Sequence, residues 1–210
     1  MNDLSFKVLS LKPSSTKKRF FQVVLENESE LNFHENSIIR YHIKENEFIE
    51  TKILYKALDH TEREQIKNKI IVLLSYRQRS KKELKDIFLS KGYKIENILN
   101  VIELLEQRKY IDDTLFAKMM ASHMIKEKKL GRYLVEQKLF QHEIDSSVME
   151  PIVSDLYKKY PPFKTIKEIL NKKGGGLEST LKNKVKIINL LKRKGFQFDE
   201  INAIVQSYNV

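Results

Sequence analysis

The chain has 210 residues, no cysteine and no tryptophan, and 32% of its residues are charged. The absence of cysteine excludes disulfides, thiolate catalysis and cysteine-ligated metal sites. The mean hydropathy is −0.46 and the longest apolar run, at residues 70–74, is five residues, which fits neither a signal peptide nor a membrane span. We therefore expect a soluble cytoplasmic protein.

The net charge of +11 is unevenly distributed along the chain. Residues 1–60 contain nine basic and nine acidic residues, whereas residues 61–210 contain thirty basic and nineteen acidic ones. An excess of this sign attracts polyanions, so nucleic acid or a nucleic-acid-coated partner is the expected ligand. A compositional bias is the alternative explanation, because lysine outnumbers arginine 31 to 8.

The first sixty residues predict a small β-meander followed by helices. Residues 6–11 and 20–25 are rich in amino acids that favour strands, and the pattern at 31–33 favours a third strand. Apolar residues then recur at helical spacing over 38–43 and again over 49–58.

From residue 61 onward the apolar residues recur with a helical period. Thr61 and Ser80 each stand three positions before a glutamate, which is the capping-box pattern that begins a helix. A further apolar stripe runs over 95–105. The sequence therefore predicts three short helices between residues 61 and 111.

This three-helix unit recurs twice when Gly92, Glu143 and Gly195 are aligned, at offsets of 51 and 52 residues. The positions eight and four before these residues are apolar in all three copies, as are those one, six, nine, ten and thirteen after them. Gly92 and Gly195 favour a turn at positive φ between two helices. Because Glu143 replaces glycine in the second copy, either its turn differs or the copy tolerates strain of about 1 kcal/mol.

The repeat gives a domain prediction with four parts. We expect an amino-terminal meander with helices at 1–60 and three-helix repeats at 61–111, 112–160 and 161–210. Stacked repeats of this kind form an elongated, curved array with contacts between neighbours. The alternative is chance, because any helical chain has apolar residues every three or four positions.

Three motifs within the repeat region resemble the signature of the RecX regulatory proteins, which modulate the RecA recombinase. They are SYRQRSKKEL at residues 75–84, KGY at 91–93 and YIDDTLFA at 110–117. Gly131 and residues 192–196 stand where the second and third repeats of that family have similar elements. The first sixty residues resemble the extra segment of its longer members.

The resemblance implies three tandem helix-turn-helix-like modules, no catalytic activity and one main target. Proteins of this family lodge in the helical groove of the RecA–single-strand filament, bridge its subunits and reduce its ATPase and strand exchange. This chain departs from the family pattern at Glu143, which replaces a glycine, and at His142, which replaces a basic residue. The glycine triplet at 174–176 predicts a flexible approach to the third repeat.

Basic clusters at corresponding places in the three repeats are the expected contacts with phosphates or with an acidic filament surface. Arg77 and Arg79 are the more telling members, because guanidinium binds such groups bidentately and this chain otherwise prefers lysine. A solvated helix face is the alternative interpretation. The predicted binding residues are Arg77, Arg79, Lys81, Lys82 and Lys91 in the first repeat, Lys126, Lys128, Lys129 and Arg132 in the second, and Lys192, Arg193 and Lys194 in the third.

No pattern in the chain predicts an enzyme, a metal site or a cofactor. The five histidines lack the spacing of metal ligands on one helix face, and the glycine triplet lacks the lysine of a phosphate-binding loop. Asp112 and Asp113 precede a helical pattern and are expected to cap it. We expect a monomer that binds the RecA filament and single- or double-stranded DNA. The alternative is a stand-alone nucleic-acid-binding protein without sequence specificity.

Overall fold

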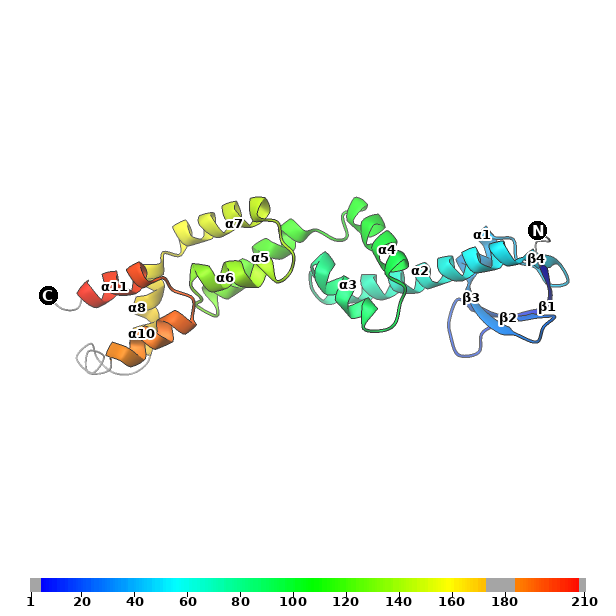
Figure 1. The fold of residues 1–210 in the computed structure, drawn as a ribbon, viewed down its shortest axis with the longest axis horizontal. Coiled ribbons are helices and arrows are strands. Elements are labelled where there is room, and N and C mark those ends of the chain that lie inside the picture. The colour runs from blue at the N-terminus through cyan, green and yellow to red at the C-terminus, as the bar shows by residue number, and fades with distance from the viewer. Residues whose placement is uncertain (1–4, 173–183, 208–210) are drawn as a thin grey trace. The chain divides into compact units, whose positions relative to one another are not determined.

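The computed structural model describes residues 5–172 and 184–207, which form a small antiparallel sheet followed by helices (Figure 1). The prediction of a mainly helical chain with an amino-terminal meander is thereby confirmed. The glycine triplet at 174–176 lies outside the described residues. The chain divides into two compact units, which comprise residues 1–77 with 84–111, and residues 78–83 with 112–210.

The sheet of the first unit has four antiparallel strands in the order β3-β2-β1-β4. The strands are β1 (Ser5–Pro13), β2 (Phe20–Leu25), β3 (Glu30–His34) and β4 (Phe48–Glu50). The first three follow the predicted meander. The fourth was not predicted, because the helical spacing was assigned from residue 49 onward.

Alternation of side chains makes the sheet apolar on one face. Val23 is paired across the strands with Leu11 and Leu31, so these three side chains lie on the same side. The next position, Gln22, is paired with Lys12 and Asn32 on the opposite, polar side. A sheet of this kind has to be covered on its apolar face.

Four helices complete the first unit, and the first three residues of one of them, α3, are grouped with the second unit. They are α1 (Glu35–Arg40), α2 (Thr51–Tyr76), α3 (Lys81–Leu89) and α4 (Ile95–Gln107). Helix α2 has 26 residues and contributes to two cores. Leu54 and Ala57 belong to the core beneath the sheet, whereas Ile66 and Ile70 are buried with residues of α3 and α4.

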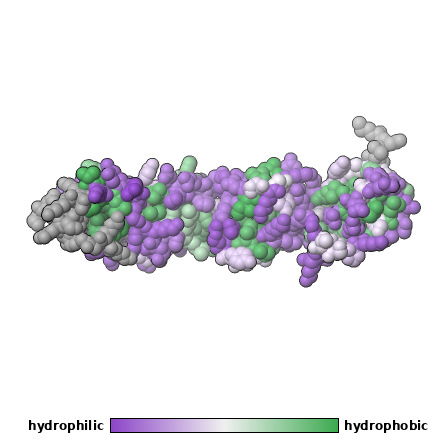
Figure 2. Space-filling view, turned by 90° about the horizontal axis from the view of Figure 1, so that it is seen from below, coloured by the Kyte–Doolittle hydropathy of each residue, from purple (hydrophilic) through white to green (hydrophobic). Residues whose placement is uncertain are grey.

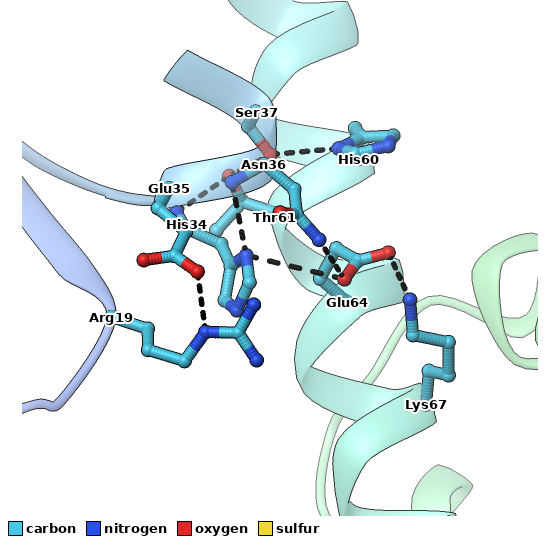
Figure 3. A network of polar contacts seen from close by, with 9 residues as sticks. All are labelled: Arg19, His34, Glu35, Asn36, Ser37, His60, Thr61, Glu64 and Lys67. Atoms are coloured by element: carbon cyan, nitrogen blue, oxygen red, sulfur yellow. Dashed lines mark hydrogen bonds and ion pairs between the residues drawn. The ribbon is translucent and has the colours of Figure 1, made fainter. Parts of the chain in front are cut away.

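The predicted helix start at Thr61 is wrong, because Thr61 lies in the middle of α2. Its side chain is buried, and its hydroxyl accepts a hydrogen bond from the His34 backbone N–H at 3.2 Å and donates one to Ser37 Oγ at 2.9 Å. Ser37 Oγ lies 2.8 Å from His60 Nδ1 (Figure 3). The hydroxyl therefore joins α2 to the end of β3 and to α1 and does not cap a helix. The predicted boundary between residues 60 and 61 falls inside this helix.

Charged groups extend the same network at its edge (Figure 3). The Glu64 carboxylate accepts hydrogen bonds from Asn36 Nδ2 at 2.8 Å and from Lys67 Nζ at 2.5 Å. Arg19 pairs with Glu35 at 2.5 Å. Burial raises the pKa of Glu64, but the hydrogen bonds from Lys67 and Asn36 outweigh that effect and bring it below its ordinary value.

The second unit contains six described helices and two cores. The helices are α5 (Asp113–Lys126), α6 (Arg132–Phe140), α7 (Ser146–Lys159), α8 (Pro162–Lys172), α10 (Lys184–Arg193) and α11 (Phe198–Ser207). One core is built by α5, α6 and α7, and the other by α8, α10 and α11. Each core thus has three helices, like the group formed by α2, α3 and α4.

The alignment of the three copies agrees with the structure at the turn and in the cores. Gly92, Glu143 and Gly195 all have positive φ, of 79°, 57° and 84°. The second copy therefore keeps the turn and tolerates the strain of a glutamate in the left-handed region. The residues four positions earlier are fully buried in all three copies, and they are Phe88, Leu139 and Leu191.

Two of the predicted helix caps are confirmed. Ser80 Oγ accepts a hydrogen bond from the Glu83 backbone N–H at 3.1 Å, and Asp112 accepts one from the Leu115 N–H at 2.9 Å. Asp113 has a different role from the one predicted, because its carboxylate accepts the Lys81 backbone N–H at 2.9 Å.

Candidate functional site

The two arginines of the first basic cluster lie in different environments. Arg77 directly follows α2, is exposed and has an extended backbone. Arg79 is ion-paired with Glu83, and its side chain is only 16% exposed. The guanidinium of Arg79 is therefore largely committed to a carboxylate of its own segment.

The lysines that follow also lie near acidic side chains. Lys81 Nζ is 3.9 Å from an Asp113 carboxylate oxygen, and Lys82 Nζ is 4.0 Å from Glu143. Ser80, which lies between Arg79 and Lys81 in the sequence, has its Oγ 3.0 Å from His142 Nδ1. The start of α3 is thus tied to residues around the second copy's turn, and the charge of this cluster is partly compensated.

The second cluster contains two exposed lysines and two paired cations. Lys126 and Lys128 are exposed. Lys129 Nζ lies 2.7 Å from Glu168, whereas Arg132 pairs with Glu136 at 2.7 Å and with Glu150 at 2.6 Å. The hydrogen bonds from Arg132 to Glu150 and Glu136 raise the pKa of the guanidinium further.

The structure brings the second and third clusters together. Lys194 Nζ donates a hydrogen bond to the Lys128 carbonyl at 2.8 Å, and the Gly131 N–H donates to the Lys194 carbonyl at 2.7 Å. A side chain at Gly131 would overlap the backbone of Gly195. Gly131 and Gly195 therefore allow the backbone before α6 and the backbone after α10 to approach closely, and the hydrogen bonds of Lys194 stabilise this contact.

The remaining predicted binding residues are exposed. Lys192 and Arg193 end α10 and line an open depression together with Lys186 and Asn189. Lys91 lies in the first unit, with its ammonium 5.6 Å from the centre of the Phe88 ring. Of the predicted binding residues, the exposed ones are thus Arg77 and Lys91 in the first unit and Lys126, Lys128, Lys192 and Arg193 in the second.

One group of lysines and aromatic rings was missed in the sequence. We call it the Tyr160–Phe163 cluster, and it consists of Lys126, Lys159, Tyr160, Phe163 and Lys167. The ammonium groups of Lys126 and Lys159 lie 5.2 Å and 5.9 Å from the centre of the Tyr160 ring, and that of Lys167 lies 4.4 Å from the Phe163 ring. The run KKYPPFK at 158–164, which alternates basic and aromatic residues, was the available signal.

The described part of the chain contains neither a cluster of metal ligands nor a membrane-spanning helix. Among residues 5–172 and 184–207, no three histidine or carboxylate side chains are placed to hold a metal ion together. Within those ranges, no helix combines the length and the apolar character that a membrane span requires. In the view of Figure 2, hydrophilic residues cover much of the visible surface and separate smaller hydrophobic patches.

Comparison with known proteins gives consistent results for sequence and fold. The regulatory protein RecX of Streptococcus mutans is 24% identical over 195 residues, which are 92% of this chain and 75% of that protein. RecX of Staphylococcus aureus strain Newman is 24% identical over 202 residues, 95% of this chain and 73% of that protein. The resemblance to the RecX family is confirmed. No family model matches the chain.

Two solved structures of RecX proteins share the fold. One, a regulatory protein RecX, has a TM-score of 0.72 at 16% identity and covers 96% of this chain and 99% of its own. RecX from Lactobacillus salivarius has a TM-score of 0.59 at 23% identity and covers 70% of this chain and 97% of its own. The RecX-like fold therefore includes both the sheet and the helical repeats of this chain.

Proposed function

We propose that this chain is a cytoplasmic, non-enzymatic regulator that binds the RecA–DNA filament and modulates, mostly by inhibition, its ATPase and strand-exchange activities. The similarity to RecX proteins over more than nine-tenths of the chain supports this proposal most strongly. The positive charge of the repeat region agrees with a partner that carries nucleic acid.

The pairing of the basic residues suggests which of them stabilise the fold and which contact the filament. Lys129 pairs with Glu168 and Lys194 binds the Lys128 carbonyl, so we assign these two to holding the second and third repeats together, whereas Arg132 joins α6 to α7 through Glu136 and Glu150. We assign contact with the filament to the exposed cations, of which Lys192 and Arg193 lie side by side at the end of α10. Arg79 is also assigned a structural role, since it is paired with Glu83 and mostly covered.

A RecA ATPase assay in the presence of single-stranded DNA tests the proposal. Substoichiometric amounts of the chain should slow ATP hydrolysis, and the Lys192→Ala/Arg193→Ala variant should need a higher concentration for the same effect. Lys52→Ala/Lys56→Ala is the matched control, because both lysines are exposed on α2 in the segment without excess charge. No slowing at any ratio would refute the proposal.

The stand-alone nucleic-acid-binding alternative is separated by a pull-down of RecA with and without single-stranded DNA. The proposed function predicts capture of RecA that increases when the strand is present. The alternative predicts no capture of RecA without DNA. In either case, contacts with phosphates make binding weaken as the salt concentration rises.

A further inference from the structure

The Tyr160–Phe163 cluster lies where three helix ends converge in the second unit. Lys126 is the last residue of α5, Lys159 is the last residue of α7, and Phe163 is the second residue of α8. The Tyr160 ring makes cation–π contacts with Lys126 of α5 and Lys159 of α7. Residues far apart in the sequence are thus brought to one site.

The site is positively charged. Residues 158–167 contain four lysines and no acidic residue. The nearest carboxylates along this stretch are Asp155, which pairs with Lys158 of the stretch itself at 3.4 Å, and Glu168, which pairs with Lys129 at 2.7 Å. A phosphate-bearing ligand would therefore meet several ammonium groups.

The aromatic rings give the site a second property. Phe163 stays 42% exposed, although the same helix buries Ile166 and Leu170 in the core. Pro161 and Pro162 restrict the backbone between the two rings, so binding costs less conformational entropy. A ring that is exposed and held in place offers a flat apolar surface to a ligand.

We propose that this cluster binds single-stranded nucleic acid directly, with an unpaired base stacked on Phe163 and the neighbouring phosphates held by Lys126, Lys159 and Lys167. Aromatic rings interleaved with lysines match the alternating bases and phosphates of a single strand. The bases of a duplex are stacked on one another, so their faces are not available to such a ring. This inference deepens the proposed function by naming the nucleic-acid contact, and it is tested without RecA.

The test measures binding of the full-length chain to a fluorescent oligothymidylate by anisotropy, beside an abasic strand of equal length that keeps the phosphates and lacks the bases. Loss of one stacked base is expected to weaken binding of the intact strand by about 5- to 140-fold in Phe163→Ala. Binding of the abasic strand should not change. The control Phe140→Ala removes a ring that is 70% exposed on α6 of the same unit, and it should behave like the wild type.

Charge is tested separately by Lys159→Gln, with the exposed Lys118→Gln of α5 as control. Lys159→Gln should weaken both strands alike and reduce the salt dependence by roughly one phosphate contact. Circular dichroism checks folding, and Phe163→Leu keeps the apolar packing while it removes the aromatic ring. The inference is overturned if Phe163→Ala and Phe163→Leu bind the intact strand like the wild type. It is also overturned if they weaken both strands equally, or if duplex DNA binds more tightly than the single strand.

Discussion

The three glycines at the turns allow the cost of backbone strain to be separated from the cost of steric overlap. Gly92 has φ of 79° and open space where a Cβ would lie. Gly131 has φ of −80°, which any residue adopts, but a Cβ there would overlap the backbone of Gly195 and Phe196. Gly195 combines both problems, since its φ is 84° and its Cβ would overlap Leu134.

Substitution of each glycine by alanine should therefore give three different losses of unfolding free energy. Gly92→Ala should lower the unfolding free energy by about 1 kcal/mol. Backbone strain at positive φ destabilises the folded chain, and the smaller conformational freedom of alanine in the unfolded chain offsets part of that strain. Gly131→Ala should cost about 1–3 kcal/mol, because backbone atoms cannot move aside as flexible side chains do. Gly195→Ala should cost about 2–4 kcal/mol, as the approximate sum of the two effects.

Urea unfolding followed by circular dichroism measures the total loss, and amide hydrogen exchange assigns it to a unit. The exchange measurement is needed because a chain with two compact units need not unfold in one step. Gly92→Ala should act on α3 and α4, whereas the other two variants should act on α6 and α10. The reasoning is refuted if Gly131→Ala is as stable as the wild type, or if Gly195→Ala costs no more than Gly92→Ala.

Two further predictions concern the network of Figure 3. Burial lowers the pKa of His34 and His60 below 6.5 in the folded chain, so the unfolded chain takes up protons first as the pH falls. The stability of the first unit should be complete above about pH 6.5 and decrease below it, and a melting temperature that rises on acidification would contradict this. Thr61→Val should lower the unfolding free energy by about 1–3 kcal/mol in urea titrations, because it leaves the buried His34 N–H without an acceptor; an unchanged urea midpoint would show that water replaces the hydroxyl.

The helix caps and turns were predictable because their causes are local. Ser80 and Asp112 cap helices through their own neighbours, and Gly92 and Gly195 mark turns by their φ. Thr61 has the same local pattern as Ser80, yet the helix continues through it, since its hydroxyl finds partners far away in the sequence. Tertiary contacts decide between two identical patterns.

The candidate site was predictable in charge and only partly in pairing. Arg79 and Arg132 each have a glutamate four residues later, which is a spacing visible in the sequence, but the second partner of Arg132, Glu150, became known only once the helices were placed. The contact of Lys194 with the Lys128 carbonyl joins residues 66 positions apart, which no spacing rule indicates. Phe163 was overlooked although its basic–aromatic surroundings are visible in the sequence. The curvature of the array and the limits of the repeats stay predictions.

Helix α2 has a thermodynamic consequence for the first unit. Its 26 residues span about 39 Å and belong both to the core beneath the sheet and to the core of the first repeat. Helix formation is cooperative, so melting of either end removes hydrogen bonds on which the other depends. Residues of the sheet and of α4 should therefore exchange their amide protons with similar protection, as members of a single cooperative unit.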